Sequence, residues 1–552
     1  MENKLPEKES LTVEFKKDPP AGLSDRTVLE EAVGFANAQG GTIFIGVNDD
    51  GTVSGVHSRN WEKPDRAVAL ITGNTVPPVR VSAEMIETAE GRILAIHVAK
   101  ATGIVSTKDG KTVRRRIKID GTPENLPFYP WEYNSRLSDL SLLDYSATQV
   151  ENATVQDLDA AERQRLRRII RMYHGDSVLL ELGDEDLDKA LSLVKTVNGE
   201  VKPTVAGLVL IGRPDRLPDL LPTSGAAFQV LQGTDVKLNE DIRLPLLAAF
   251  EQILTLFKAW NPEHEVQEGL FRVPIPEFSE RAFREGIVNA FCHRDYSILG
   301  RVSVQISDDG LSITSPGSFI EGVTLENILT VEPKGRNPVL CDVLKRIGLA
   351  ERTGRGVDRI FEGSIVYGRP WPDYSESNEV SVRLFIPRMR ADMAFHKMLM
   401  DYREKRGNAV SLTALTILSA LKFSKRLTTA EISEQTHINP LRLRRQIEQL
   451  IEDGLIEAVG SGRAREYVLS STVYRDQEKS IRHVRIVGIE AIKREELVLR
   501  CAQEAGSISR ADVMELLGIT GPQAYRILQK LVKSGQLSAL GEGKKTRYTL
   551  QK

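Results

Sequence analysis

A carboxylate and a carboxamide stand four residues apart near the middle of the chain, at Glu285 and Asn289. Residues at this spacing share one face of an α-helix. A carboxylate there can act as a general base, and an amide oxygen beside it can bind Mg²⁺. The pair could therefore place both groups at one phosphate of a nucleotide.

Further along the chain, Gly354 and Gly356 form a glycine turn that is followed by a helical pattern. Backbone amides exposed by glycines at the start of a helix bind anions. A glycine turn of this kind is, by itself, most often only a tight turn. Together with Glu285 and Asn289, it predicts a nucleotide site built from two separate segments.

The segments around these residues alternate between strand and helix patterns. Residues 203–212 form a continuous apolar run that we interpret as a buried strand, and residues 226–231 predict another strand. Residues 302–314 alternate around an Asp-Asp-Gly turn and predict a hairpin. Helical periodicity predicts three helices, at residues 157–171, 242–260 and 339–347.

The N-terminal segment has its own strand and helix pattern, with strands expected at residues 11–15 and 42–47 and a helix at residues 27–39. A basic stretch follows. A strand there would point alternate cations to one face, which suits a phosphate backbone. A charged edge strand in solvent is the other interpretation. The candidate nucleic-acid-binding residues are Lys111, Arg114, Arg115, Arg116 and Lys118.

The C-terminal third contains two similar segments, within residues 405–472 and 490–552. Each predicts a helix, a turn, a second helix and a hairpin, which is the order of a winged helix-turn-helix. The second helix of such a unit lies in the major groove of DNA, although a protein-docking role is an alternative. Cations on these helices and wings are candidate DNA-binding residues: Arg442, Arg444, Arg445, Arg463, Arg465, Arg526, Lys530, Lys544, Lys545 and Arg547.

Composition is ordinary for a folded protein. Hydrophobic residues make up 41% and charged residues 27%, and the net charge of −2 means that any nucleic-acid surface must be local. The length predicts roughly three to five domains. Three scattered cysteines fit a reducing compartment. Because we find neither a bilayer-spanning apolar run nor a signal-peptide core, we expect a cytoplasmic protein without a membrane partner.

The N-terminal motifs resemble a known family. Glu9-Ser10, Glu14-Phe15-Lys16, Phe35-Ala36-Asn37, Gly40-Gly41 and Ile45-Gly46-Val47, with Asp49 and Gly51 after them, occur in order within residues 1–130. They are similar to the AlbA-type domain of the Schlafen family, which in bacteria implies DNA binding. In some animal members the equivalent domain cleaves tRNA with two glutamates and an aspartate. The matching residues here are Glu9, Glu14 and Asp49.

These three carboxylates have two interpretations. Clustered carboxylates can hold a divalent ion such as Mg²⁺ or Mn²⁺ against a phosphodiester. Alternatively, Glu9 and Glu14 are salt-bridged strand residues, and Asp49 is a turn former.

The middle motif, Glu285 and Asn289 followed by His293-Arg294-Asp295-Tyr296, also carries a resemblance. It resembles a divergent Bergerat-like ATPase module that follows AlbA-type domains in bacterial regulators and is distantly similar to gyrase, histidine kinases and MutL. The resemblance implies ATP and Mg²⁺ as cofactors, with Asn289 as the metal ligand and Glu285 as the base. It also implies nucleotide-binding glycines at Gly317, Gly354 and Gly356. Where better-known relatives place an adenine-binding aspartate in an Asp-x-Gly turn, this chain has Ser315-Pro316-Gly317.

Together these patterns predict an α/β (α+β) multidomain fold. We expect an AlbA-type Schlafen domain at residues 1–130, a helical connector at 131–200, a divergent ATP-binding domain at 201–395, and two winged-helix domains at 405–472 and 490–552. The leading interpretation is an ATP-responsive transcriptional regulator that binds double-stranded DNA as a homo-oligomer. The alternative is an ATP-regulated, metal-dependent RNA or DNA endonuclease of Schlafen type, acting for example against phage. A third is an interaction scaffold whose nucleotide site has decayed.

Overall fold

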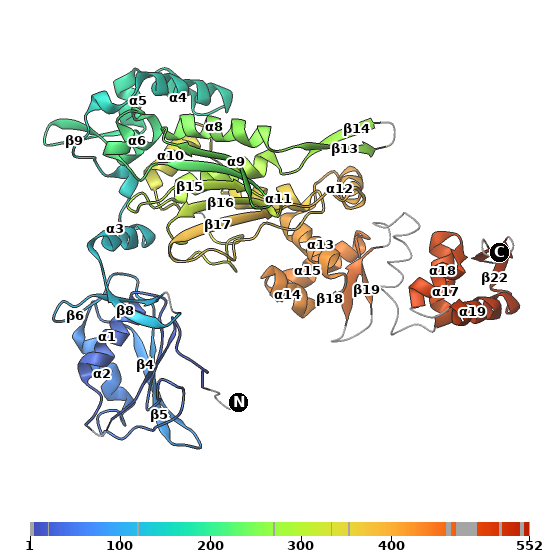
Figure 1. Cartoon of the computed structure of the whole chain (residues 1–552), viewed down its shortest axis with the longest axis horizontal. Coiled ribbons are helices and arrows are strands. Elements are labelled where there is room, and N and C mark those ends of the chain that lie inside the picture. The colour runs from blue at the N-terminus through green and yellow to red at the C-terminus, as the bar shows by residue number, and fades with distance from the viewer. Residues whose placement is uncertain are drawn as a thin grey trace.

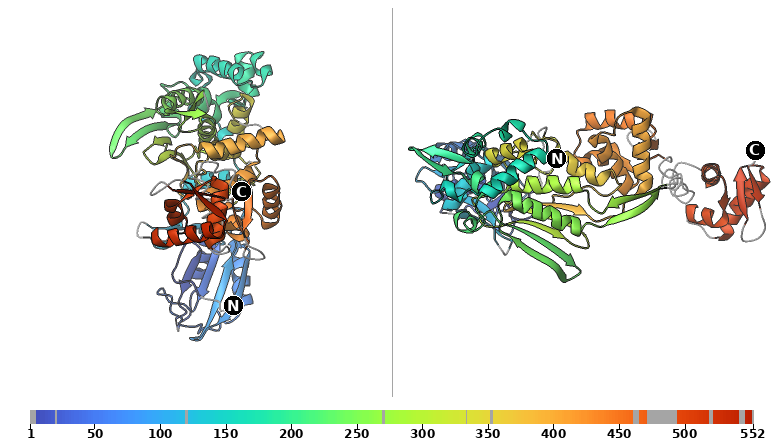
Figure 2. Two further views of the ribbon diagram at one scale, coloured as in Figure 1. Left: turned by 90° about the vertical axis from the view of Figure 1, so that its right-hand side faces the viewer. Right: turned by 90° about the horizontal axis from the view of Figure 1, so that it is seen from above.

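The computed structural model describes residues 5–19, 21–118, 121–268, 271–332, 334–350, 354–459, 465–470, 494–517, 521–540 and 546–550. Figure 1 shows an N-terminal α/β region, a larger central region built around one mixed sheet, and two small helical units toward the C-terminus. Figure 2 shows the hairpin of β13 (Glu263–Glu268) and β14 (Phe271–Pro276) extending from the central region.

A four-stranded sheet organises the N-terminal region. Its order is β1-β2-β5-β4, with β1 parallel to β2 and the other pairs antiparallel. The helix α1 (Asp25–Ala36) begins where the Ser24 hydroxyl accepts a hydrogen bond from the Thr27 amide, and its apolar face is buried. The strands are β1 (Val13–Lys16), β2 (Gly41–Ile45), β4 (Val81–Glu87) and β5 (Arg92–Val98).

The basic stretch of the N-terminal region is held against its core. It forms β7 (Val113–Ile117), which pairs with β8 (Pro123–Pro127) and packs on α1. At the end of α1, the buried Asn37 amide donates 2.8 Å hydrogen bonds to the carbonyls of Val105 and Val113. Because a buried amide must find such partners, Asn37 fixes the position of the whole hairpin.

The central sheet has the order β12-β11-β15-β16-β17. β11 runs parallel to β15, and the other neighbours are antiparallel. The hairpin predicted at residues 302–314 is confirmed as β15 and β16, and the strand predicted at residues 226–231 is β11. The strands are β11 (Ala226–Gln232), β12 (Asp235–Ile242), β15 (Val302–Ile306), β16 (Gly310–Pro316) and β17 (Ser381–Pro387).

Four helices pack with this sheet: α8 (Leu246–Ala259), α9 (Glu280–His293), α10 (Pro338–Arg346) and α11 (Gly356–Ile365). All four contribute to the hydrophobic cluster that the sheet also joins. Phe257 of α8 stacks on Phe283 of α9 with ring centroids 3.7 Å apart, which fixes α9 in place. Figure 1 shows α9 and α11 beside the sheet.

The strand predicted at residues 203–212 is wrong. These residues form the helix α6 (Val205–Ile211), which begins where the Thr204 hydroxyl accepts a hydrogen bond from the Gly207 amide. Every residue of α6 is buried, because α4 (Ala160–Met172) and α8 both pack against it. An apolar run buried on all sides has no periodicity, so the sequence alone could not separate a helix from a strand.

The residues between the N-terminal region and α6 join the central core. α4 confirms the helix predicted at residues 157–171, and Leu166 and Ile169 lie in the same hydrophobic cluster as the central sheet. A 2.8 Å ion pair between Arg163 and Asp188 connects α4 to α5 (Asp184–Ala190). Before them, α3 (Pro130–Asp139) leads out of the N-terminal region.

Two C-terminal units repeat one element order. In each unit a short strand follows the first helix, and two strands follow the third. The first unit, residues 411–470, has the sheet β18-β20-β19, and the second, residues 494–550, has the sheet β21-β23-β22. The strands are β18 (Leu427–Thr428), β19 (Ile456–Val459), β20 (Glu466–Leu469), β21 (Ile508–Ser509), β22 (Leu537–Leu540) and β23 (Arg547–Leu550). The helices are α13 (Leu412–Ser424), α14 (Thr429–Thr436), α15 (Pro440–Glu452), α17 (Arg494–Ala505), α18 (Arg510–Leu517) and α19 (Gly521–Lys533). No helix among the described residues is both long enough and apolar enough to cross a membrane.

Candidate functional site

The candidate site lies on α9. The Ser279 hydroxyl caps this helix by accepting a hydrogen bond from the Ala282 amide, and its inner face packs on the sheet. Glu285 and Asn289 lie on this helix, and both line a cavity of about 240 Å³. Gly354 and Gly356 line the same cavity. The structure thus brings the two predicted segments of the site together.

Gly356 stands against the carboxylate of Glu285. A Cβ atom at position 356 would lie 2.0 Å from Oε1 of Glu285 and 2.8 Å from its Cδ. A side chain at position 356 would therefore require the carboxylate of Glu285 to move. The neighbouring Gly354 has φ +74°, a conformation that favours glycine. The glycine turn therefore places the start of α11 directly over the acid.

The environment of Glu285 suits a base. Its side chain is buried, and burial raises the pKa of Glu285 against the opposing charges of Arg359, Arg284 and Arg281. A carboxylate with a raised pKa is a stronger proton acceptor than a free one. Glu285 can therefore take a proton from a water molecule in the cavity.

We expect Glu285→Gln to stabilise the fold at neutral pH and above. Because the folded-state pKa of Glu285 is raised, the unfolded chain ionises first as pH rises, and the wild type loses stability until the folded-state pKa is passed. Glutamine does not titrate, so the difference should vanish at and below about pH 4, near the pKa of a free glutamate. Thermal unfolding of both proteins between about pH 4 and about pH 8 measures this difference in stability. Equal stability at about pH 8 would contradict the prediction.

Other residues of the cavity were not predicted. Lys334 and Lys345 line it, and their ammonium groups can neutralise phosphate oxygens. His293 also lines it, but burial and the charges of Arg336 and Lys345 lower the pKa of His293 to about 4, so the ring is neutral at physiological pH. The two lysines belong to separate segments with no motif spacing, and only the folded chain reveals them.

The turn at residues 315–317 closes one side of the cavity. The Ser315 hydroxyl donates a 2.7 Å hydrogen bond to the Ala290 carbonyl, which joins β16 to α9. Gly317, with φ +102°, packs against Asp295, while its neighbours Ser315 and Ser318 line the cavity. Gly317 thus shapes the turn beneath the cavity.

Two of the scattered cysteines meet at this site. The Cys341 thiol lies 3.6 Å from the carbonyl oxygen of Cys292, and both residues line the cavity. The contact with the Cys341 thiol raises the pKa of Cys292, and burial raises it further. Cys292 is therefore a protonated, inert side chain at neutral pH.

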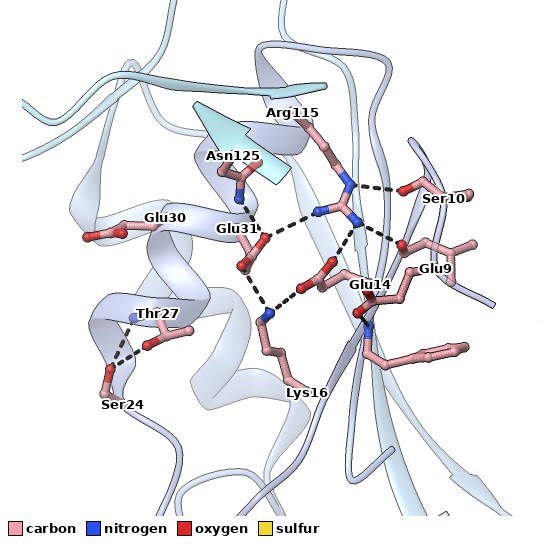
Figure 3. Close-up of polar contacts among 12 residues, drawn as sticks. Glu9, Ser10, Glu14, Lys16, Ser24, Thr27, Glu30, Glu31, Arg115 and Asn125 are labelled. Carbon is pink, nitrogen blue, oxygen red and sulfur yellow. Dashed lines mark hydrogen bonds and ion pairs between the residues drawn. The ribbon is translucent and has the colours of Figure 1, made fainter. Parts of the chain in front are cut away.

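The N-terminal carboxylates lie in a different kind of environment (Figure 3). Glu14 forms a 2.5 Å ion pair with Arg115, and it also contacts Lys16. Lys16 and Arg115 both reach Glu31 as well, at 3.2 and 3.5 Å. Two acids and two cations therefore neutralise one another inside the region.

Of the other two predicted carboxylates, Glu9 lies beside this network and Asp49 lies away from it. Glu9 accepts a 3.1 Å hydrogen bond from the Phe15 amide, and Asp49 lies exposed in a turn after β2. Among the residues that the structure describes, no group of three acidic, histidine or cysteine side chains is arranged to hold a metal ion. The structure does not bring Glu9, Glu14 and Asp49 into such a group.

Acids accompany the cations of the basic stretch. Lys111 pairs with Glu30 at 2.6 Å and Lys118 with Glu124 at 3.5 Å, while Arg114 and Arg116 both contact Glu132. The expectation that Arg115 faces nucleic acid needs correction, because this side chain is only 1% exposed. Residues alternate across a strand, and Arg115 falls on the buried face of β7 with Val113.

The predicted cations of the C-terminal units are mostly exposed. On α15, Arg442, Arg444 and Arg445 are exposed, and Arg442 donates a 3.0 Å hydrogen bond to the Thr413 hydroxyl. Arg465 stands over the Tyr467 ring. In the second unit, Arg526, Lys530 and Arg547 are exposed. The remaining predicted cations, Arg463, Lys544 and Lys545, lie outside the described residues.

Three family models match separate parts of the chain. Residues 9–120 match the model "Schlafen, AlbA_2", and residues 300–386 match "Putative ATP-dependent DNA helicase recG C-terminal". Residues 136–225 match a domain of unknown function, DUF8451. The chain therefore contains a Schlafen AlbA_2 domain and a recG-like C-terminal domain. The second match includes Gly354 and Gly356 and begins just after Glu285 and Asn289.

Two further comparisons covered the whole chain. The search of curated proteins found no match. Among solved structures, the crystal structure of the DIP2311 protein from Corynebacterium diphtheriae is similar over 98% of this chain and 95% of that one. Its identity is 19% and its TM-score 0.47.

Proposed function

We propose that this chain is an ATP-responsive, DNA-binding transcriptional regulator. The observation that carries the proposal is the cavity at which an acid and an amide on α9 meet the glycine turn that begins α11. The match of residues 300–386 to a recG-like C-terminal domain supports an ATP-dependent role linked to nucleic acid. The AlbA_2 match and the two C-terminal units support nucleic acid as the partner.

The residues around the cavity fit Mg²⁺ and ATP. The amide oxygen of Asn289 is a ligand of the hard type that Mg²⁺ accepts, and Lys334 and Lys345 can bind phosphate oxygens. ATP supplies a triphosphate whose terminal group is open to attack by water. In this proposal Glu285 orients that water and accepts its proton, while the backbone at Gly354 and Gly356 covers the phosphates.

The C-terminal units are, in this proposal, winged helices. Each places a helix with an exposed cationic face after a short turn, followed by a small antiparallel sheet. The second helix, α15 or α19, would enter the major groove of double-stranded DNA. Arginines on α15 can bind guanine edges or phosphates. ATP would act on DNA affinity through α11, which packs on both α9 and α13.

Titration calorimetry with ATP and Mg²⁺ tests the nucleotide part. We expect the wild type to bind and Asn289→Ala to lose roughly tenfold or more in affinity, because its metal ligand is removed. Asn239→Ala, at an exposed position of β12, is the matched control and should bind as the wild type does. Absence of binding in the wild type, or equal binding by Asn289→Ala, contradicts the proposed site.

A DNA-binding titration tests the regulatory part. Genomic fragments that the protein enriches, sequenced and then titrated with and without ATP, give the affinity in both states. We expect ATP to change it by about 5-fold or more. An affinity that stays constant over a wide range of ATP concentration refutes an ATP-responsive regulator.

A further inference from the structure

A second cavity lies between the recG-like domain and the first C-terminal unit. Its volume is about 700 Å³. One bank consists of residues 325–330, residues 371–375 and the start of α11. The other bank consists of the start of α13 and the turn between α14 and α15, residues 435–442. Figure 1 shows α13 beside α11, with α14 and α15 beyond it.

Acids are more numerous on one bank, and the other bank carries an arginine and a histidine. Glu326, Asp358 and Asp373 lie on the bank of the recG-like domain, where Arg355 also lies, 3.4 Å from Asp358. His437 and Arg442 lie on the facing bank. The Thr324 hydroxyl and, to a smaller extent, the charge of His437 lower the pKa of Glu326, which supports the proximity of the banks. The start of α15 thus faces acids.

The first unit shares a hydrophobic core with α11. Phe361 and Ile365 of α11 belong to the same hydrophobic cluster as Leu415 and Leu418 of α13. The first residue of α11, Gly356, lies against Glu285. Further along the helix, Gly363 allows close packing on Ala282. One rigid helix therefore contacts both the nucleotide cavity and the first unit.

The two cavities also share a wall. Ile328 and Leu329 line both of them, and so do Asp358 and Tyr374. A movement of residues 325–330 that admits a nucleotide to the first cavity must therefore change the second. We therefore expect nucleotide binding at the first cavity to move the acidic bank of the second.

Duplex DNA does not fit in the second cavity. A helix that reads the major groove does so with its first residues, and here Asn439 and Arg442 point to a cavity of about 700 Å³. Pockets of about 300–1,000 Å³ hold small molecules. Asn439 and Arg442, although exposed, thus border a space that is too small for a duplex.

We propose that this arrangement is a closed state, in which the acids Glu326 and Asp373 take the place of DNA phosphates opposite Arg442 and His437. The start of α15 must move away from this bank before it contacts a duplex. The inference rests on the proposed DNA binding and adds an autoinhibitory surface to it. It also assigns Arg442 to the face that the duplex contacts after opening.

Charge reversal at Glu326 tests the closed state. Glu326→Arg repels Arg442 and His437, so we expect the DNA affinity to rise by about 5-fold or more, even without nucleotide. Asp309→Arg is the matched control, because Asp309 is exposed at the turn between β15 and β16, away from both banks. Asp309→Arg adds the same charge to the same domain, and we expect it to change the DNA affinity at most slightly.

Hydrogen exchange gives an independent measurement without DNA. In Glu326→Arg, the amides of residues 325–330 and 435–442 should exchange faster than in the wild type, and in Asp309→Arg they should not. Unchanged exchange in Glu326→Arg, or equal DNA affinity in the two variants, overturns the closed state. Absence of DNA binding in the wild type and all variants instead overturns the proposed function, so the two failures are distinct.

Discussion

Gly356→Ala is expected to abolish nucleotide binding and to lower the stability of the central region by about 1–3 kcal/mol. The added Cβ would lie 2.0 Å from Oε1 of Glu285, so the acid and the start of α11 cannot both keep their positions. If the acid moves, the cavity loses its base. If α11 moves, the glycine turn no longer covers the phosphates. Calorimetry with ATP and Mg²⁺ and chemical unfolding measure both consequences.

Two further variants make this result specific. Gly73→Ala places the same methyl group on the helix α2 (Pro64–Asn74), where nothing lies within 4 Å, and should be neutral or slightly stabilising. Adding Glu285→Ala to Gly356→Ala removes the clash, so stability should return while nucleotide hydrolysis should not. A double variant that remains as unstable as Gly356→Ala would show that the methyl group clashes with something other than Glu285.

The sequence predicts an element best where the spacing of neighbouring residues determines that element. Glu285 and Asn289 share a helix because four residues make about one turn. The hairpin at residues 302–314 could be predicted because alternation and an Asp-Asp-Gly turn agree. The repeated order of elements near the C-terminus could be predicted for the same reason. In each case neighbouring residues fix the element, and distant contacts only confirm it.

Other features depend on distant contacts and could not be predicted. The apolar run at residues 203–212 became a helix because neighbours bury it on all sides. Lys345 of α10 and Lys334, which lies before that helix, meet at the cavity only in the folded chain. Arg115 was expected at the surface, but its position in β7 turns it toward Glu14, a residue far away in the sequence. A basic stretch alone does not reveal which of its cations an acid already neutralises.

Arg115 and Glu14 therefore provide the second large prediction. Glu14→Ala should destabilise the N-terminal region by about 3 kcal/mol, because removing one partner of a buried ion pair leaves the other charge uncompensated. Arg115 is 1% exposed and keeps the carbonyls of Ser10 and Val13 and the more distant Glu31 as partners. Urea unfolding of the full chain, followed by hydrogen exchange of β1 and β7, measures the loss.

Controls separate this structural role from catalysis. Glu30→Ala removes a partly exposed carboxylate of α1 that pairs with Lys111, and should cost less than about 1 kcal/mol. Replacing both partners, in Glu14→Leu with Arg115→Met, should recover much of the stability, because an apolar pair no longer buries a lone charge. A metal-dependent nuclease predicts the reverse, with Glu14→Ala folded and inactive toward RNA. Glu14→Ala with wild-type stability would remove the argument that this carboxylate is a structural partner of Arg115.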